Sequence, residues 1–556
     1  MIGDLWYKNN VIYSLDLETF MDSNGDGVGD IEGLIRRLDY LESLGVGVLW
    51  IAPFQPTPNR DNGYDISDYF GVDPRHGSSG DFVELIHQAH ARGLKIIIDL
   101  VVNHTSDRHP WFQEARRDPE SLYRDWYTWS KKRPPDWDKG MVFPGIQKAT
   151  WTRDEIARQY YFHRFYAFQP DLNTDNPEVR EQIRRIVGFW LQTGVSGFRV
   201  DAVPFIIESV SPFGQPHQMH FEYLTELREF LQWRSGDAVL LGEANVLPKE
   251  NKKYFADGRG LHMMFNFFVN QHLFYALATG DVRPLIDSLR ATRRLPPTGQ
   301  WAQFLRNHDE LDLGRLGPEM RERVFQRFGP EPRMQLYDRG IRRRLASMLG
   351  DRARIELAYS VMFSLPGTPV IRYGDEIGMG EDLSLDQRDS VRTPMQWTDE
   401  PNAGFSTAEK LIHPVIDDGV YGYRKVNVEA QRRDPDSLMR WMTRMIRIRR
   451  ETPEIGWGDW DVISTGSPNI LALCYRWEGK AVVVVHNFDE RSREAKFRLK
   501  VDGGERLVSL FDDEESRADA RGTHRITLDA NGYRWYRVGS ANYALRHEAE
   551  DFPTGK

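Results

Sequence analysis

Cysteine is almost missing from this chain, because Cys474 is the only one among 556 residues. A single thiol excludes any intrachain disulfide and any metal centre built from several thiolates. Positive charge is not in excess either: 73 lysines and arginines face 82 aspartates and glutamates, which gives a formal net charge of −9. This balance argues against general affinity for nucleic acid or for an anionic membrane, and we expect neither as a partner.

Long apolar runs are also missing. No stretch approaches the roughly 18 consecutive apolar residues that a membrane-spanning helix needs. The first residues, MIGDLWYKNN, lack the basic and then apolar pattern of a secretory leader. The simplest prediction is a cytoplasmic protein. A chain of 556 residues exceeds what one hydrophobic core usually serves, so we expect several domains or one large barrel with attachments.

Eight short apolar segments have the composition of buried parallel strands, and each runs into polar residues. Amphipathic stretches such as 31–45 and 81–93 lie between them and close on glycine, as helices often do. This alternation predicts a (β/α)8 TIM barrel. A doubly wound sheet is the alternative, because a count of strands does not show closure. The predicted strands are 11–16, 46–51, 95–102, 197–201, 238–243, 262–267, 302–309 and 369–376.

Two parts of the chain depart from this alternation. Residues 104–173 are rich in Trp, Tyr, Arg and Pro without a clean period, which indicates an inserted subdomain after the third strand. From about residue 455 the chain has short alternating runs divided by turn signals, typical of an antiparallel β-sandwich domain. We therefore expect a catalytic barrel of residues 1–103 and 174–454, the subdomain 104–173, a β-domain 455–545 and a polar tail 546–556.

The carboxyl ends of the predicted strands are unusually polar, and these ends meet at one mouth of a closed barrel. Asp201 and Glu243 follow neighbouring strands and predict a nucleophile and an acid/base for retaining glycoside chemistry. Arg199 precedes Asp201 by two residues, on the same side of the strand, and should hold that carboxylate ionised. Asp309 would be a third acid that binds sugar hydroxyls. Phosphoryl transfer with acid-bound magnesium is a weaker alternative, since no Gly-rich phosphate loop is present.

Four segments resemble the diagnostic motifs of the alpha-amylase superfamily: DLVVNH (99–104), GFRVDAV (197–203), LLGEAN (240–245) and RNHDE (306–310). QPDLN (169–173) is similar to a fifth motif, in the form shared by oligo-1,6-glucosidases, alpha-glucosidases and trehalose synthases. The resemblance implies a β-glucosyl intermediate on Asp201, with Glu243 as acid/base and Asp309 as transition-state stabiliser. It also implies a subsite for the reacting glucose formed by Tyr64, Asp65, His104, Arg199, His308 and Arg392.

Within that superfamily, segments such as 104–119, 340–352 and 420–431 resemble trehalose synthases over nearly the entire chain. Such enzymes interconvert maltose and trehalose, so the resemblance implies these or other short α-glucosides as substrates and requires no redox cofactor. Dimers are common among them, which allows a homodimer here. Residues 208–224 and 312–316 depart from the usual pattern and would border the acceptor glucose. Two alternatives therefore stay open: an α-glucosidase or α-amylase-type hydrolase, and, more remotely, a catalytically inactive scaffold.

The loop DSNGDGVGD (22–30) resembles the front of a calcium loop, with polar residues at alternating positions and Gly27 at the turn. An EF-hand is not expected, because Gly33 stands at its twelfth position and a strand precedes the loop. A loop of Asx turns without metal is the alternative. The predicted ligands are Asp22, Asn24, Asp26, Val28 and Asp30.

A second calcium site is implied by the resemblance alone. Its ligands would be Asn103, Asp171 and Glu208, with the carbonyls of Phe205 and Ile206. Oxygen-only ligands favour calcium over zinc. We therefore expect one or two structural Ca²⁺ ions.

Overall fold

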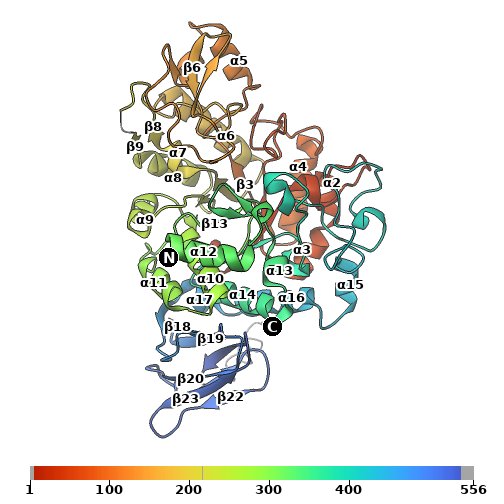
Figure 1. Cartoon of the computed structure of the whole chain (residues 1–556), viewed down its shortest axis with the longest axis vertical. Coiled ribbons are helices and arrows are strands. Elements are labelled where there is room, and N and C mark those ends of the chain that lie inside the picture. The colour runs from red at the N-terminus through yellow and green to blue at the C-terminus, as the bar shows by residue number, and fades with distance from the viewer. Residues whose placement is uncertain (1–4, 216, 540–556) are drawn as a thin grey trace, which may run out of the picture.

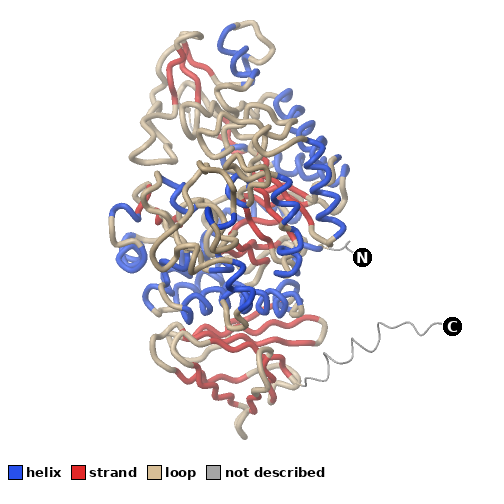
Figure 2. The backbone as a smooth tube through the Cα atoms, turned by 90° about the vertical axis from the view of Figure 1, so that its right-hand side faces the viewer, coloured by secondary structure: helices blue, strands red, loops and turns tan. Residues whose placement is uncertain are grey.

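The computed structural model describes residues 5–215 and 217–539, and its centre is a closed barrel of eight parallel strands (Figures 1 and 2). The strands neighbour one another in the order β1-β16-β12-β11-β10-β7-β3-β2. Each lies within, or within two residues of, one of the eight predicted segments, so the TIM barrel is confirmed and the doubly wound sheet is excluded. The strands are β1 Ile12–Leu15, β2 Val48–Ile51, β3 Lys95–Leu100, β7 Gly197–Val200, β10 Val239–Gly242, β11 Met263–Phe265, β12 Gln300–Phe304 and β16 Thr368–Arg372.

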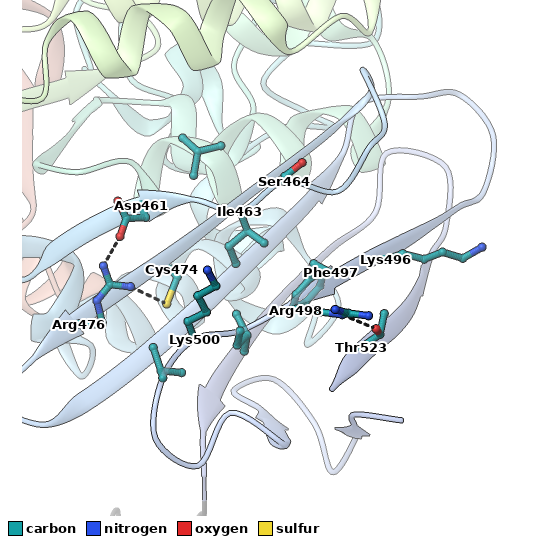
Figure 3. A pocket seen from close by; sticks show the side chains of 13 residues that line it. Asp461, Ile463, Ser464, Cys474, Arg476, Lys496, Phe497, Arg498, Lys500 and Thr523 are labelled. Carbon is teal, nitrogen blue, oxygen red and sulfur yellow. Dashed lines mark hydrogen bonds and ion pairs between the residues drawn. The ribbon is translucent and has the colours of Figure 1, made fainter. Parts of the chain in front are cut away.

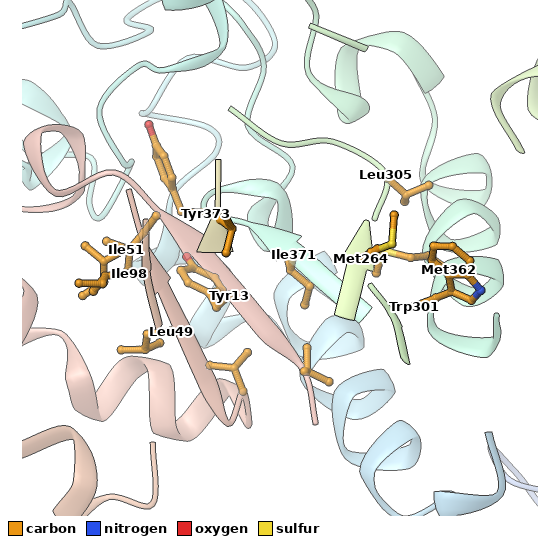
Figure 4. Packing of buried hydrophobic residues seen from close by; sticks show 14 of the residues in the cluster. Tyr13, Leu49, Ile51, Ile98, Met264, Trp301, Leu305, Met362, Ile371 and Tyr373 are labelled. Carbon is orange, nitrogen blue, oxygen red and sulfur yellow. The ribbon is translucent and has the colours of Figure 1, made fainter. Parts of the chain in front are cut away.

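Alternate side chains of these strands build two separate cores, as the two-residue period of a strand requires. Trp50, Ile97 and Leu241 belong to a cluster inside the barrel. Leu49 and Ile98, one position away, belong to the cluster that packs against the surrounding helices (Figure 4). Both strand faces are therefore buried, which explains why these segments read as continuous apolar runs.

Helices surround the barrel on its outer face (Figure 2). The stretch 31–45, predicted as one helix, is two helices separated at Arg37. The backbone of Arg37 leaves helical geometry (φ −106°, ψ 4°), and its guanidinium lies 4.1 Å from the centroid of the Trp397 ring. Because both helices bury an apolar face, the spacing of apolar residues in the sequence does not reveal the break between them. The helices around the barrel include α2 Ile31–Arg36, α3 Leu38–Leu44, α4 Ser79–Ala91, α6 Pro177–Gln192, α8 Glu222–Arg234, α10 Phe267–Thr279, α11 Arg283–Ala291, α12 Pro318–Phe328, α14 Arg352–Ser364 and α16 Leu438–Arg450.

Shorter elements occupy the loops at the carboxyl ends of the strands and the links between helices. Their bounds are α1 Leu17–Phe20, α7 Val203–Ile206, β8 Glu208–Ser209, β9 Gln218–Met219, α9 Pro248–Phe255, β13 Leu311–Asp312, β14 Gln335–Leu336, β15 Gly340–Ile341, α13 Leu345–Leu349, α15 Val428–Arg433 and α17 Pro453–Trp457. Strands β13, β15 and β14 form a small sheet within the long loop that follows β12.

The segment after β3 leaves the barrel and forms the subdomain at the top of Figure 1. It contains helix α5 (Pro110–Arg117) and a sheet in the order β4-β6-β5, formed by Trp129–Ser130, Gln159–Phe162 and Trp151–Asp154. A bridge between His104 and Asp171 joins the start and the end of this excursion, and a bridge between Tyr127 and Leu172 joins an inner segment to its end. The subdomain therefore returns beside the point where it left, next to the barrel mouth.

The C-terminal domain is an antiparallel β-structure, shown at the bottom of Figures 1 and 2. A six-stranded sheet has the order β17-β18-β19-β24-β21-β22, and β20 pairs with β23 in a second sheet. Cys474 is buried between them, as a small core residue. The predicted polar tail 546–556 lies outside the described residues. The strands are β17 Asp459–Val462, β18 Ile470–Trp477, β19 Lys480–Asn487, β20 Arg493–Arg498, β21 Arg506–Ser509, β22 Glu515–Arg517, β23 Thr523–Leu528 and β24 Tyr533–Val538.

Candidate active site

A cavity of about 500 Å³ opens at the carboxyl ends of the barrel strands. Acidic, basic and aromatic side chains from the segments after β2, β3, β7, β10, β12 and β16 line it, together with part of the inserted subdomain. The lining residues that concern the chemistry are Asp61, Tyr64, His104, Phe143, Phe165, Asp201, Glu243, Asn245, His308, Asp309, Asp312, Arg315, Arg339 and Arg388.

Arg199 holds two of the predicted acids at the floor of this cavity. Its Nη1 lies 2.5 Å from Asp201 Oδ1, and its Nη2 lies 2.8 Å from Glu243 Oε2. Asp99 of β3 approaches the same Nη1 at 2.5 Å. Because one guanidinium touches both carboxylates, Asp201 and Glu243 face a common space, as the strand ends predicted.

Ala202, directly after Asp201, has a left-handed backbone with φ of 49°. This conformation is costly for a residue with a side chain, and such residues cluster at functional sites. Here it turns the Ala202 N–H toward Glu243, whose Oε2 accepts from it at 3.2 Å. The backbone therefore contributes to fixing the second carboxylate.

Both carboxylates have raised pKa values. Burial raises the pKa of Asp201 to about 6, although Arg199 opposes this effect. Burial also raises the pKa of Glu243 to about 7, with further contributions from the negative charges of Asp201 and Asp309. The sequence predicted that Arg199 would keep Asp201 ionised; its guanidinium does favour the charged form, but desolvation of the carboxylate is the larger effect.

Asp309 has the opposite electrostatic setting. Arg388 Nη1 and Arg392 Nη2 lie 2.9 Å and 3.2 Å from Asp309 Oδ1. Burial by itself would raise the pKa of Asp309, but the positive charges of Arg388 and Arg392 hold it well below its ordinary value. Asp309 is therefore a permanent negative charge at the mouth of the cavity.

Three predicted ring-bearing residues also lie in the cavity. The Tyr64 hydroxyl and His308 Nε2 are 2.9 Å apart, and their rings stack with centroids 5.5 Å apart. His104 Nε2 lies 3.0 Å from the Tyr64 carbonyl. Burial lowers the pKa of His104 to about 4 and that of His308 to about 3, so both imidazoles are neutral near pH 7. Neutral rings can exchange hydrogen bonds with sugar hydroxyls without adding charge.

Asp65, predicted beside the sugar, does not line the cavity. It is fully buried, and its Oδ1 accepts from the Thr57 hydroxyl at 2.9 Å and from the Arg60 N–H at 3.1 Å. Asp61, four residues earlier, lines the cavity instead. Left-handed residues Asn62 and Gly63 (φ 46° and 92°) reverse the chain between the two acids, so their directions could not be read from the sequence.

The predicted arginine is also replaced by a neighbour in the sequence: Arg388 lines the cavity, and Arg392 does not. Arg392 donates from Nε to the His308 carbonyl at 2.9 Å and is 3% exposed, so it supports Asp309 from behind and lies outside the lining residues. Arg388 faces the cavity and also pairs with Glu310 at 2.8 Å. Arg388 and Asp61 are the functional candidates that the sequence reasoning missed. The sequence offered one hint of them: Asp61 lies near Asp65 in RDNGYD, and Arg388 lies near Arg392 in QRDSVR.

The first predicted calcium loop is shaped by its own hydrogen bonds. The carboxylate of Asp22 accepts from the Gly25 and Gly27 N–H groups at 2.7 and 2.8 Å, and Asp26 accepts from the Val28 N–H at 2.9 Å. Within residues 5–215 and 217–539, no group of three His, Cys, Asp or Glu side chains is arranged as a metal site. These contacts are the Asx turns that the sequence offered as the alternative to a metal site. The carboxylate oxygens of Asp22 and Asp26 are also suitable ligands for a hard cation.

Three of the five predicted donors of the second calcium site, Asp171, Asn103 and Glu208, interact with one another. Burial raises the pKa of Asp171 to about 7, while a hydrogen bond from Asn103 lowers it and the charge of Glu208 raises it. Glu208 binds Arg164 and lies 2.6 Å from His217 Nδ1, and the Ile206 carbonyl accepts from the Thr174 hydroxyl at 2.7 Å. A buried carboxylate with an amide and a second carboxylate nearby supplies oxygen donors of the kind that calcium prefers.

A second cavity, of about 530 Å³, lies in the C-terminal domain (Figure 3). Asp461 and Arg476 pair at its edge, Cys474 forms part of its floor, and Lys500 extends into it. Asp461 is its only acid, so it lacks the two facing carboxylates that glycoside chemistry needs. The barrel mouth is therefore the candidate active site.

This chain is similar to known proteins over nearly all of its length. The sequence model of the alpha-amylase catalytic domain family matches residues 14–326 and 338–458. The sequence model of the sucrose hydrolase-like C-terminal domain family matches residues 479–537. A trehalose synthase of Thermus thermophilus is 42% identical over 99% of the chain, which spans 57% of that relative's length. A trehalose synthase/amylase of Mycobacterium tuberculosis is 40% identical over 96% of the chain and 90% of its own.

Solved structures agree in fold. A trehalose-6-phosphate hydrolase of Bacillus licheniformis superposes with a TM-score of 0.77 at 28% identity, covering 96% of this chain and all of its own. In the part of the chain that the structure describes, no helix is both long and apolar enough to cross a bilayer.

Proposed function

The chain belongs to the alpha-amylase family, and from that premise we propose that it interconverts maltose and trehalose by intramolecular transglucosylation. The observation that carries the proposal is the contact of Asp201 and Glu243 with one guanidinium, at a cavity of about 500 Å³. Similarity to trehalose synthases over nearly the whole chain supports the choice of reaction within the family.

The proposed first step breaks the glycosidic bond. The Asp201 carboxylate attacks the anomeric carbon of the non-reducing glucose, and Glu243 donates its proton to the departing glycosidic oxygen. We assign that proton to Glu243 Oε1, because Oε2 accepts from Arg199 and Ala202. Asp309, held ionised by two arginines, would stabilise the positive charge that develops on the sugar ring.

The second step uses the released glucose as the acceptor. This glucose turns over in the cavity, and its anomeric hydroxyl attacks the glucosyl carbon while Glu243 takes back the proton and Asp201 leaves. Two inversions give net retention. If water attacks instead, the same residues perform hydrolysis, which makes an α-glucosidase the second candidate function. The relative from Mycobacterium tuberculosis is named a trehalose synthase/amylase, which supports keeping both candidate functions.

We also propose that Asp61 and Arg388, together with Tyr64, His104 and His308, bind the reacting glucose. Asp61 faces the cavity, and burial raises its pKa to about 6 although Arg388 opposes this effect. A carboxylate and a guanidinium side by side can accept from and donate to neighbouring sugar hydroxyls. Asp65 and Arg392 would support this pair and the catalytic acid from outside the cavity.

The deciding experiment is incubation with maltose and, separately, with trehalose, followed by separation of the products. Formation of trehalose from maltose, and of maltose from trehalose, is the expected result. Glucose as the only product would replace the proposal with the hydrolase. No turnover of either sugar would favour the inactive scaffold. The oligomeric state, with a homodimer as the prediction, can be measured on the same sample by light scattering.

A further inference from the structure

The cavity of about 530 Å³ in the C-terminal domain has an excess of positive charge, although the whole chain has a formal net charge of −9. Both sheets of the domain contribute to this basic cavity, through β17 and β18 on one side and through β20, the segment after it and β23 on the other. Among its lining residues Asp461 is the one acid, and the cations are Arg476, Lys496, Arg498 and Lys500. A concave site lined by one sign of charge attracts ions of the other sign.

Asp461 does not neutralise this excess, because two arginines share its carboxylate. Its Oδ1 accepts from Arg293 Nη1 at 2.9 Å, and its Oδ2 pairs with Arg476. Arg476 also donates from Nη1 to Cys474 Sγ at 3.7 Å. The guanidinium of Arg476 is thereby held in one orientation at the edge of the basic cavity.

Arg498 and Lys500 are the cations without an acid at ion-pair distance. Arg498 Nε donates at 3.1 Å to the neutral hydroxyl of Thr523, its direct neighbour on β23. Within residues 5–215 and 217–539, the Lys500 ammonium has neither an ion pair nor a hydrogen bond. Figure 3 shows Lys500 directed into the cavity. Both side chains therefore keep N–H donors that a bound anion can use.

Like charges also face each other beside the basic cavity. Lys496 of β20 lies directly opposite Arg525 of β23. Both cations contact the same oxygen of Glu494, at 2.9 Å and 3.3 Å. Like charges in directly opposed positions destabilise an antiparallel pair. An anion bound nearby relieves this repulsion, so the arrangement favours a role in binding over a purely structural one.

Apolar side chains form walls beside these cations. Ile463, Leu499 and Val501 pack against the core of the domain and also line the cavity. Inorganic phosphate would leave these walls in contact with water, whereas an organic group would cover them. The volume is in the range of sites for small molecules. The basic cavity thus fits an anion that combines several negative charges with an organic portion.

We propose that the basic cavity binds a small organic phosphate, whose phosphate oxygens accept from Arg476, Arg498 and Lys500. Guanidinium and ammonium groups are the usual protein partners of phosphate. The organic portion would lie against the apolar walls. Phosphorylated sugars and nucleotides share this chemistry, and the experiment below distinguishes them. The site goes beyond the proposed function, because the C-terminal domain lies at the opposite end of the molecule from the inserted subdomain beside the barrel mouth (Figure 1).

The test is calorimetric titration of the full chain with ATP and with glucose 6-phosphate, and with inorganic phosphate for comparison. We expect saturable binding of at least one organic phosphate at one site. It should bind at least about tenfold more tightly than inorganic phosphate, because its organic portion covers apolar surface. Equal affinity for inorganic phosphate would overturn the assignment of an organic ligand.

Two variants locate the bound molecule. Arg498→Ala and Lys500→Met should each raise Kd about tenfold, the factor that corresponds to one lost hydrogen bond to a charged group. Methionine keeps an unbranched apolar stem, so Lys500→Met reports on the charge. The control Arg517→Ala removes an exposed arginine of the same domain that lies 3.7 Å from Glu515 and does not line the cavity. This control should keep the wild-type Kd.

The outcomes are distinct. Saturable binding of only one probe identifies the ligand as a sugar phosphate or a nucleotide. If neither organic phosphate binds, the proposal is wrong. It is also wrong if Arg498→Ala and Lys500→Met weaken binding no more than Arg517→Ala, since the probe then binds elsewhere. Unchanged melting temperature and maltose turnover verify that each variant is folded. None of these results depends on whether maltose is converted to trehalose, so failure of the proposed function is seen separately.

Discussion

Asp201 and Glu243 are joined through opposite nitrogens of Arg199, at 2.5 Å and 2.8 Å, although they come from different strands. The two acids share one positive charge but differ in pKa, about 6 and about 7, with burial as the main cause of both values. The acid with the higher pKa retains its proton when the other has lost it. This order suits Asp201 as the nucleophile and Glu243 as the proton donor.

Replacement of Asp201 by asparagine should abolish both transfer and hydrolysis. We expect a loss of more than about 10³-fold in kcat, because the covalent intermediate cannot form. The raised pKa of Asp201 means that the folded protein disfavours this buried charge, so the neutral variant should melt at or above the wild-type temperature. Activity assays and calorimetry on the same preparation test both statements; near-normal turnover would refute covalent catalysis.

The pH dependence of turnover should be bell-shaped, with its maximum between about 6 and 7. Below this window Asp201 gains a proton and loses its nucleophilicity; above it Glu243 loses the proton that it must donate. The two apparent values belong to the interacting pair. The measurement is kcat/KM for maltose from pH 4 to pH 9. A Glu243→Gln variant should retain little activity and lose the basic limb, and persistence of that limb would contradict the assignment of Glu243.

Mutation can show whether Asp61 and Arg388, or instead Asp65 and Arg392, bind the sugar. Asp61→Ala should lower kcat/KM at least about 10²-fold, since a site built to bind sugar hydroxyls suffers when one polar partner is removed. Arg388→Ala should act in the same direction. Asp65→Ala should act mainly on stability, lowering the melting temperature by several degrees, because Asp65 holds the Thr57 and Arg60 segment together. The opposite pattern would restore Asp65 as the sugar ligand.

Calcium should stabilise the fold. With free calcium at about 100 times its Kd, a single site adds about 2.7 kcal/mol, a shift of a few degrees in Tm that chelation should reverse. Asp171→Asn tests the site beside the subdomain, and Asp26→Asn tests the loop 22–30. Each variant should lose only the part of the calcium response that belongs to its own site. If the wild type has the same Tm with calcium and with chelator, the prediction that it binds structural calcium is wrong.

The sequence was most informative where strands end. Asp201, Glu243 and Asp309 were predicted as catalytic acids because the ends of parallel strands converge at one mouth, and motif resemblance implied their roles. It was less informative in loops, where Asp61 and Asp65 are separated by a reversal of the chain. The basic cavity of the C-terminal domain was out of reach, because its lining residues come from two different sheets.

By itself, the sequence predicted the eight strands and the acids that follow them, because a strand's two-residue period and the alternation of strands with helices are local properties. Tertiary structure alone decided that the barrel closes, that burial outweighs Arg199 in the pKa of Asp201, and that Arg388 rather than Arg392 lines the cavity. These outcomes depend on charges and contacts summed over groups that are distant along the chain, and no local pattern records that sum.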